Sequence, residues 1–383
     1  MKTSRHERKL VFENGKVFLG RSFGGNFDKG SYSIFEVVFN TSMVGYQEII
    51  SDASYFGQAV CMTYPLIGNY GIIKNDFESE FEVPHISALI VSEVCLYPFN
   101  SASFENLENF MCKFNVPGIF DVDTRKITRM LKDEGSMRAI LTDANINDYE
   151  AVNLIKSFPI VKNHVSNVSC KNIKRFFCNE NTEKVFKVVL IDCGVKTNII
   201  RELSKRNCDV ISVPYDTDYV SILNMNPDGV LVSNGPGDPI DNFSTISTIK
   251  NLRGKVPVFG ICLGHQMIAL ALGGTTYKLR FGHRGGNHPV KDLTDGKIRV
   301  TSQNHSYAVD PDSLKNFKLT HINLLDNTIE GIEDKKNFMF SIQFHPEGSP
   351  GPRDNLYLFD KFLLNMKIFK KRFSLSRVYN AKK

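Results

Sequence analysis

A cysteine between glycines is the most distinctive candidate for chemistry in this sequence. In VPVFGICLGHQMIALALGG (256–274) an apolar run leads into GICLG (260–264), and apolar residues with helical spacing follow. GICLG is the cysteine counterpart of the G-x-S-x-G elbow, in which glycines permit a sharp strand-to-helix turn that exposes the nucleophile. The amino end of a helix also favours a thiolate. This context predicts that Cys262 is a nucleophile rather than a buried structural cysteine, the usual role of an isolated one.

His345 and Glu347 are the candidates for the base and its orienting group, both of which a cysteine nucleophile needs. They follow an apolar, strand-like run in FMFSIQFHPEGSP (338–350). Because a residue before proline is held extended, we expect the two side chains to project on the same side. The carboxylate would then fix the imidazole tautomer while the other ring nitrogen faces the thiol. H-P-E alone is a weak pattern, and the upstream elbow makes it specific.

The loop SNGPGDP (233–239) is a third feature, directly after the apolar run GVLV. Two glycines and two prolines fix its backbone, so its N–H groups could stabilise an oxyanion or hold a carboxylate. The same composition fits an ordinary turn equally well.

Metal and nucleotide chemistry find less support. His283, His288 and His305 lie in two histidine-rich segments, but no carboxylate or cysteine spacing accompanies them. Hydrogen-bonding loop histidines therefore explain them better than a metal site. No G-x-x-x-x-G-K-[ST] loop occurs, since GNFDKGS (25–31) lacks the lysine that should follow its second glycine. No G-x-G-x-x-G follows an expected strand either.

The elements that must position these residues follow from the apolar pattern. The second half alternates apolar strand-like runs with helical spacing, which predicts an α/β fold with a doubly wound, mainly parallel sheet. In such a sheet the ligand site lies at the carboxyl ends of the strands, where the unusual residues fall. The expected strands are 185–192, 208–214, 227–234 and 256–261, and the expected helices lie within 195–207, 241–253 and 263–274.

The first half predicts an α+β domain of mixed connectivity. Runs rich in β-branched and aromatic residues at 33–40, 57–64 and 85–94 are typical of strands. VDTRKITRMLKDEG (122–135) predicts a helix with Asp123 or Thr124 as its cap and Gly135 as its end. The expected domains are 1–150, a linker or peripheral segment at 151–184, a catalytic domain at 185–375 and a basic tail at 376–383.

Composition bounds the class of protein. The chain has 383 residues and a net charge of +6, with much of the excess at its two ends, which is too little for a nucleic-acid-binding footprint. Eight dispersed cysteines without paired spacing fit reduced thiols in a cytoplasmic protein. No signal-peptide core and no apolar stretch of about 18 residues is present, so we expect no membrane segment.

Together these motifs resemble a known family. GICLGHQ, SNGPGDP and QFHPE are similar to the class I, triad-type glutamine amidotransferase domain. FNTSMVGYQEIISDASY (39–55), TYPLIGNYG (63–71), DVDTRKITRML (121–131) and FGHRGGNHPV (281–290) resemble the small, glutamine-hydrolysing subunit of carbamoyl-phosphate synthase. The resemblance runs from about residue 10 to about residue 370. It argues against amidotransferases of the anthranilate or guanylate synthases, and the intact candidate triad argues against a non-catalytic binding subunit.

The resemblance implies a role for each matching residue. Cys262 would attack the side-chain amide of L-glutamine, His345 would transfer protons and Glu347 would orient His345, through a γ-glutamyl thioester. Oxyanion donors would be the backbone N–H groups of Gly237 and Leu263. The implied glutamine-binding residues are Ser54, Gly235, Gly237, Leu263, Gln266, Asn304, Ser306 and Tyr307.

The resemblance also implies a partner. Ammonia would pass to a large subunit that makes carbamoyl phosphate from bicarbonate and ATP, for arginine and pyrimidine biosynthesis. ATP and a divalent metal would then belong to the large subunit, with no cofactor on this chain and no nucleic-acid or membrane partner.

Three positions depart from the family pattern. Ala53 replaces a frequent proline before Ser54, and Thr197 replaces a usual basic residue. Ser306 replaces a frequent glycine, so it would be strained if its φ were positive. None of the three belongs to the candidate triad, so we expect hydrolysis to survive and glutamine affinity to be the more sensitive property.

Overall fold

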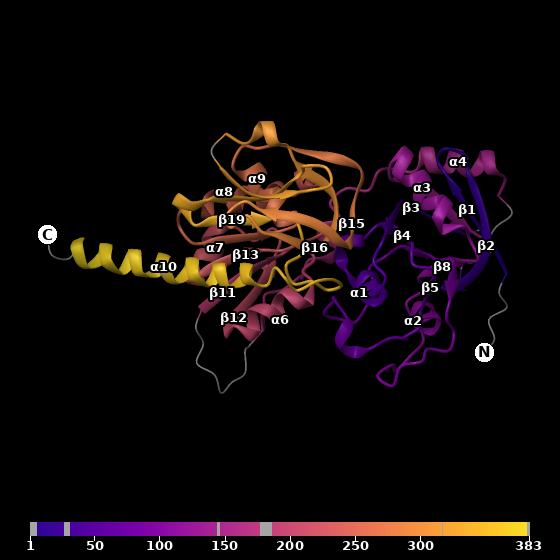
Figure 1. The fold of residues 1–383 in the computed structure, drawn as a ribbon, viewed down its shortest axis with the longest axis horizontal. Helices are drawn as coiled ribbons and strands as arrows, with labels where there is room; N and C mark the ends of the chain where they lie inside the picture. The colour runs from indigo at the N-terminus through magenta and orange to yellow at the C-terminus, as the bar shows by residue number, and fades with distance from the viewer. Residues whose placement is uncertain (1–5, 27–30, 144–145, 177–185, 316, 381–383) are drawn as a thin grey trace. The chain divides into compact units, whose positions relative to one another are not determined.

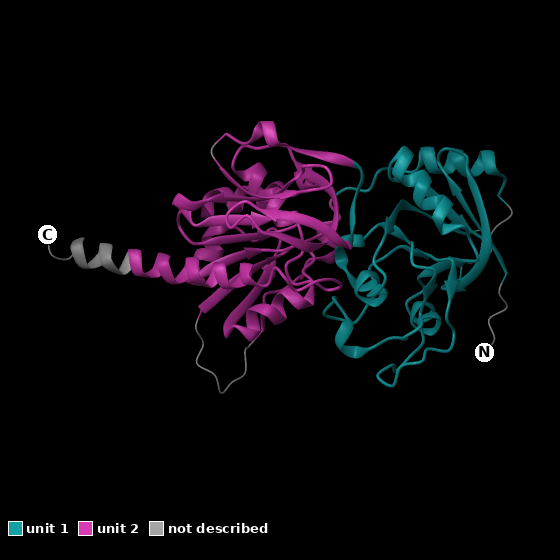
Figure 2. Cartoon of the chain, viewed as in Figure 1, with its two compact units in different colours: residues 1–162, 280–285 teal, residues 163–279, 286–383 magenta. Residues whose placement is uncertain are grey.

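The computed structural model describes residues 6–26, 31–143, 146–176, 186–315 and 317–380 (Figure 1). Two compact units make up the chain (Figure 2). Unit 1 is Met1–Lys162 with Arg280–Gly285, and unit 2 is Asn163–Leu279 with Gly286–Lys383.

Unit 2 is built on a sheet that, in the described residues, has ten strands in the order β10-β12-β11-β13-β14-β19-β18-β17-β15-β16. Its centre, from β12 to β19, is parallel, and antiparallel strands extend it on both sides. The strands are β10 (Lys174–Phe176), β11 (Phe186–Asp192), β12 (Cys208–Pro214), β13 (Gly229–Val232), β14 (Val258–Ile261), β15 (Thr276–Asp292), β16 (Ile298–Val309), β17 (Lys318–Asn323), β18 (Ile329–Asp334) and β19 (Met339–Ile342). The prediction of a mainly parallel sheet is confirmed for this central part.

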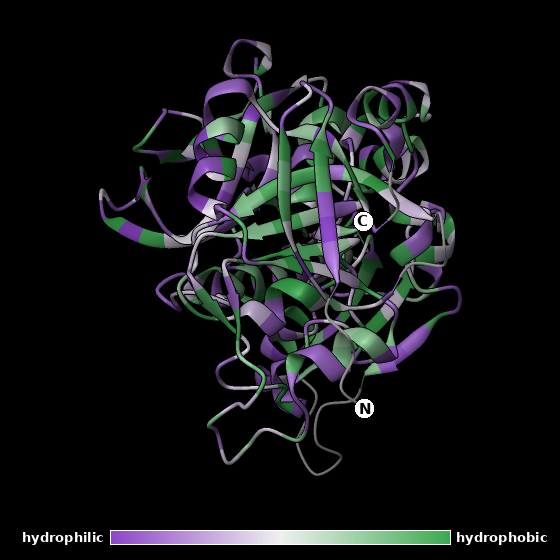
Figure 3. Cartoon of the chain, turned by 90° about the vertical axis from the view of Figure 1, so that its right-hand side faces the viewer, coloured by the Kyte–Doolittle hydropathy of each residue, from purple (hydrophilic) through white to green (hydrophobic). Residues whose placement is uncertain are grey.

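Helices cover both faces of the central strands, as the near-continuous apolar runs predict. Successive residues of β11 alternate between two cores: Val189 and Ile191 pack with one set of helices, and Val188 and Leu190 with the other. The first core includes α7 (Tyr219–Asn224), α8 (Phe243–Leu252) and α9 (Leu263–Ala271). The second includes α6 (Thr197–Lys205) and α10 (Tyr357–Asn380). Apolar strands are not confined to unit 2: Figure 3, which is viewed from the right-hand side of Figure 1, shows several green strands near its middle, green being the colour of apolar residues.

Unit 1 contains a closed barrel in the order β1-β2-β8-β6-β4-β3-β9. The mixed connectivity is confirmed, because β3, β4, β6 and β8 pair in parallel and the other pairs are antiparallel. Closure was not predicted, since single strands carry no signal for which edges meet. The strands are β1 (Glu7–Phe12), β2 (Val17–Gly24), β3 (Tyr32–Asn40), β4 (Gln58–Met62), β6 (Ala88–Ile90), β8 (Pro117–Phe120) and β9 (Met137–Thr142), with a separate pair β5 (Leu66–Ile67) and β7 (Glu93–Val94).

The helices of unit 1 are α1 (Tyr46–Ser51), α2 (Leu107–Lys113), α3 (Thr124–Glu134) and α4 (Asp148–Ser157). The predicted helix at 122–135 is confirmed as α3. The Asp123 side chain caps it by accepting from Lys126 N at 2.8 Å, and Gly135 ends it with φ +100°. Its apolar face, with Ile127 and Leu131, is fully buried.

Two expected segments differ from the structure. Part of 151–184 is not a bare linker: α4 packs on β1 and β9 of unit 1, and α5 (Val165–Val168) and β10 belong to unit 2. Residues 177–185 lie outside the described part. The expected tail at 376–383 overlaps α10, which runs to Asn380, because the helical pattern begun at Tyr357 continues without a break. The long strands β15 and β16 were not predicted: the glycines and the proline of β15 interrupt its strand pattern, and the polar run SQNHS interrupts that of β16.

Gly264 gives a test of the packing at the elbow. A Cβ there would lie 2.3 Å from the Val232 carbonyl oxygen, whereas one at Gly296 would meet nothing within 4 Å. We expect Gly264→Ala to lower the free energy of unfolding by about 1–3 kcal/mol, despite the better helix propensity of alanine. Gly296→Ala, at φ +75°, controls for backbone strain alone at about 1 kcal/mol. A Gly264→Ala variant that is as stable as wild type in urea unfolding would contradict the close approach.

Candidate active site

Cys262 lies at the turn between β14 and α9, as the elbow motif predicts. Its backbone has φ 54° and ψ −103°, an unusual conformation for a residue other than glycine. The Cys262 N–H donates to the Ile342 carbonyl oxygen at 2.9 Å, which ties the turn to β19. Gly260 and Gly264 pack so tightly that a Cβ on either would lie under 3.0 Å from neighbouring atoms. The sequence folds this way because only glycine fits on both sides of the strained residue.

His345 and Glu347 project together beyond β19, as the His-Pro-Glu order predicts. His345 Nδ1 lies 2.7 Å from Glu347 Oε1, and both side chains are buried. The His345 N–H donates to the Ser302 carbonyl oxygen at 2.9 Å, which fixes this segment against β16. With Nδ1 held by the carboxylate, Nε2 is the ring nitrogen available for proton transfer.

The charges in this pair support one another. Burial is the largest influence on the imidazole and opposes its charging, but attraction to Glu347 and the neighbouring Cys262 together outweigh it and raise the pKa of His345 to about 10. Cys262 adds to this rise, so its sulfur lies close enough to interact with the imidazole. Burial likewise disfavours the Glu347 carboxylate, yet Lys196 and His345 together hold its pKa at about 2. The geometry therefore stabilises an imidazolium–carboxylate pair.

Lys196 is a charged residue of this site that the sequence analysis did not select. Its Nζ lies 3.1 Å from Glu347 Oε1 and also donates to the Ser349 carbonyl oxygen, with the side chain 2% exposed. Asn198 Nδ2 donates to the Glu347 carbonyl oxygen at 3.0 Å. Both residues belong to the segment after β11, at the carboxyl end of a central strand. That position was the signal that could have identified them.

The loop 233–239 is a rigid part of the site rather than an ordinary turn. A Cβ on Gly235 would lie 2.1 Å from the Cys193 carbonyl oxygen, and Gly237 has φ +87°. Asn234 joins the loop to the neighbouring segment, because its Oδ1 accepts from Lys196 N at 3.1 Å and its Nδ2 donates to Gly194 O at 3.0 Å. At the first position of α9, the Leu263 N–H has no intrahelical acceptor.

The remaining candidate binding residues lie on α9 and β16, with one in unit 1. Gln266, on α9, donates through Nε2 to the Tyr307 carbonyl oxygen at 2.8 Å. The Asn304 carbonyl oxygen on β16 lies 3.4 Å from Cys262 Sγ. Ser306 lies between Asn304 and Tyr307 on the same strand. Ser54 belongs to unit 1, in a short 3-10 helix (Ala53–Tyr55).

Two of the departures from the family pattern are accommodated locally. Ser306 is not among the residues with positive φ, so the expected condition for strain is not met. Ala53 begins the 3-10 helix, where the Asp52 side chain accepts from Ser54 N at 2.8 Å and fixes the turn that a proline would otherwise stiffen. Thr197 begins α6, and no contact in the structure explains it.

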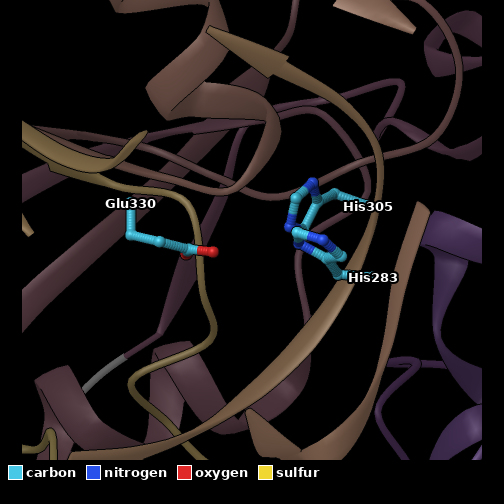
Figure 4. A group of neighbouring side chains, drawn as sticks. All are labelled: His283, His305 and Glu330. Atoms are coloured by element: carbon cyan, nitrogen blue, oxygen red, sulfur yellow. The ribbon is translucent and has the colours of Figure 1, made fainter. Parts of the chain in front are cut away.

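The histidine-rich segments lie on the strands β15 and β16, so the prediction that these are loop histidines was wrong, while His305 does make the expected hydrogen bonds. His305 Nδ1 lies 2.8 Å from the Tyr307 carbonyl oxygen, and Nε2 lies 3.0 Å from Gln303 Oε1. Glu330, drawn with His305 in Figure 4, accepts from Gln303 Nε2 at 3.0 Å and from Asn323 Nδ2 at 2.8 Å. His283, also labelled there, belongs to unit 1. A metal ion on His305 would have to displace one of its two hydrogen bonds.

Comparison with known proteins agrees with this geometry. Residues 189–365 match the family model "Glutamine amidotransferase class-I", and residues 10–141 match "Carbamoyl-phosphate synthase small chain, CPSase domain". A carbamoyl phosphate synthase small chain of Fusobacterium nucleatum is 47% identical over 94% of this chain and 98% of its own length. The chain belongs to the carbamoyl phosphate synthase small chain family.

Two further relatives support the assignment. The carbamoyl phosphate synthase small chain of Staphylococcus epidermidis is 48% identical over 96% of this chain and 98% of its own length. The carbamoyl phosphate synthase small chain of Bacillus cereus is 47% identical over 95% of this chain and 97% of its own length. As a member of this family, the chain carries a glutamine amidotransferase domain in unit 2. Among its described helices, none has the length and apolar character that crossing a membrane requires.

The His345–Glu347 pair predicts how stability depends on pH. The raised pKa of His345 means that its stabilisation is complete below its ordinary value of 6.5 and is lost as pH rises through about 10. The lowered pKa of Glu347 means that its stabilisation is present above 4.5 and is lost as pH falls toward 2. We expect wild type to exceed Glu347→Gln in Tm most strongly between pH 4.5 and 6.5.

The difference in the free energy of unfolding between wild type and Glu347→Gln should then shrink by about 2 kcal/mol or more as the pH rises to 10. Thermal unfolding of both proteins at pH 5, 6, 8 and 10 measures it. A difference that stays constant over this range would contradict the charged pair.

Proposed function

We propose that the chain is the glutaminase subunit of a carbamoyl phosphate synthase, with Cys262, His345 and Glu347 as its catalytic triad. The observation that carries the proposal is the strained, buried cysteine at a strand-to-helix elbow, beside an imidazole whose far nitrogen is fixed by a carboxylate at 2.7 Å. Class I family membership supports the same assignment. The intact triad argues against a non-catalytic binding subunit.

In the proposed reaction, His345 takes the thiol proton of Cys262, and the resulting thiolate sulfur attacks the side-chain carbonyl carbon of L-glutamine. The oxyanion that forms would accept hydrogen bonds from the N–H groups of Gly237 and Leu263. His345, charged and held by Glu347, gives its proton to the leaving nitrogen, so ammonia departs and a γ-glutamyl thioester remains. Neutral His345 then takes a proton from water, which attacks the thioester. Glutamate is released and the thiol is restored.

The proposed glutamine-binding residues in unit 2 are Gly235, Gly237, Leu263, Gln266, Asn304, Ser306 and Tyr307. Polar groups from α9 and β16 support this assignment, since an amino-acid substrate needs donors and acceptors for its carboxylate and ammonium. Ser54, from unit 1, is proposed to complete the set by similarity alone.

Ammonia is proposed to pass to a large subunit that consumes ATP and bicarbonate, in the cytoplasm, where carbamoyl phosphate feeds arginine and pyrimidine synthesis. The names of the relatives support a partner subunit, since each is a small chain of a synthase. ATP and a divalent metal would be bound by that partner, and no cofactor is proposed on this chain.

Cys262→Ser tests the nucleophile. In the complex we expect it to abolish glutamine-dependent carbamoyl phosphate synthesis, by at least about a thousandfold, because a serine hydroxyl is far less nucleophilic at neutral pH. Synthesis from free ammonia should persist, since that nitrogen bypasses the thiol. Cys95→Ser, in unit 1, is the matched control and should leave both rates unchanged. Retained glutamine-dependent synthesis in Cys262→Ser would overturn the assignment.

The partner is tested by co-purification followed by a glutaminase assay. We expect an ATP-dependent large subunit to bind the full chain and to raise its rate of glutamine hydrolysis, because the isolated chain should organise its site incompletely. The comparison is glutamate release with and without the partner. Full-rate hydrolysis by the isolated chain, with no gain on adding the large subunit, would contradict the proposed dependence.

A further inference from the structure

Gln343 is a buried residue at the active site to which neither the motifs nor the proposed triad gives a role. It follows β19 directly, precedes His345 by two residues and is fully buried. Its backbone N–H donates to the Glu330 carbonyl oxygen at 2.9 Å, which anchors it to β18. Its side-chain amide lies between two functional residues: Oε1 is 3.0 Å from Gln266 Nε2, and Nε2 is 3.7 Å from Cys262 Sγ.

The hydrogen-bond network determines which way this amide points. Gln266 Nε2 donates to the Tyr307 carbonyl oxygen at 2.8 Å, and a carbonyl oxygen can only accept, so the nitrogen of Gln266 must face Tyr307. The same nitrogen also faces Gln343, which must therefore present its oxygen there. The amide of Gln343 then has one orientation left, with its N–H groups toward the Cys262 sulfur.

A donor aimed at sulfur does not treat the two forms of the cysteine equally. The thiol donates weakly and accepts weakly, and its hydrogen has the Asn304 carbonyl oxygen at 3.4 Å as an acceptor. The thiolate has no hydrogen to give, so it loses that contact and gains from the N–H of Gln343. The Asn304 carbonyl therefore favours the thiol, and the Gln343 amide favours the thiolate.

We propose that Gln343 is a positioning residue that holds the Cys262 sulfur as a thiolate and couples it to the glutamine-binding Gln266. The inference rests on the proposed function, because it assumes that Cys262 is the nucleophile. Both N–H groups of Gln266 are engaged by Tyr307 and Gln343, so the Gln266 amide keeps one orientation, with its oxygen as the acceptor left for a substrate. One side chain thus fixes both a substrate contact and the reacting atom.

The test is the pH profile of Cys262 alkylation by iodoacetamide in the full chain, followed by mass spectrometry of the cysteine peptides. Gln343→Met keeps the volume and removes the donor. We expect its profile to shift upward by about 1 pH unit, with alkylation at neutral pH slowed about 3- to 10-fold, because hydrogen bonds to charged groups are among the strong ones. The alkylation profile of Gln343→Glu should shift further upward in pH, since the introduced carboxylate repels the thiolate.

Ser341→Ala is the matched control. Ser341 is a buried residue of β19, two residues before Gln343, that hydrogen-bonds His265 at 2.9 Å, so its loss costs a buried contact of similar size without removing a donor to Cys262. Its profile should coincide with that of wild type. A purely structural role for Gln343 would lower the stability of both Gln343 variants and leave their alkylation profiles unchanged.

The outcomes separate the two proposals. If wild-type Cys262 is no more reactive than the buried Cys193 and Cys208, the nucleophile assignment fails. If Cys262 is reactive and Gln343→Met has the wild-type profile, only the role of Gln343 is overturned. Labelling of Cys193 and Cys208 also reports unfolding. Should Gln343→Met unfold, Gln266→Met carries the test, because it releases the Gln343 amide and should shift the profile in the same direction.

Discussion

The buried carboxylate of Glu347 is the interaction on which the architecture of unit 2 depends. The desolvation free energy of a fully buried charge without partners exceeds the net stability of a typical domain. The fold must therefore supply opposite charges at short range. It does so with Lys196 at 3.1 Å and His345 at 2.7 Å. Lys196 follows β11 and His345 follows β19, two strands that are not neighbours in the sheet. The charges therefore meet only if the parallel order of the sheet is correct.

The same requirement explains why the chemistry gathers at one edge of the sheet. Parallel strands all end on the same side, so the segments after β11, β13, β14 and β19 bring a lysine, a rigid glycine loop, a strained cysteine and a histidine together. Each segment is fixed to the next by a backbone or side-chain hydrogen bond. Examples are Asn234 to Lys196 and Cys262 to Ile342. A strained nucleophile can persist there because its surroundings determine its conformation.

Polar side chains continue this network behind the triad. Gln343 lies between the substrate-binding candidate and the sulfur, and the Tyr307 carbonyl sets the direction of the whole chain of amides. In a buried site each donor has few alternative acceptors. The Tyr307 carbonyl oxygen, which can only accept, therefore fixes the orientation of the Gln266 amide and, through it, that of the Gln343 amide. The sulfur of Cys262 therefore has two polar neighbours of opposite kind, the Gln343 amide and the Asn304 carbonyl oxygen.

Local sequence determined much of this protein. The elbow at Cys262, the His345–Glu347 pair, α3 with its caps, and the four predicted parallel strands follow from spacing within about twenty residues, where glycine, proline and apolar periodicity act directly. Spacing alone did not identify Lys196 and Gln343. The place of Lys196 after a central strand put it at the correct edge of the sheet, but neither residue's local sequence shows which groups lie opposite it. Barrel closure in unit 1 and the long strands β15 and β16 also escaped, since pairing partners far apart in the chain leave no local signal. The sequence by itself determined which groups could react. The tertiary structure alone decided which charges and hydrogen-bond donors surround them, because burial and hydrogen-bond direction arise only when distant segments meet.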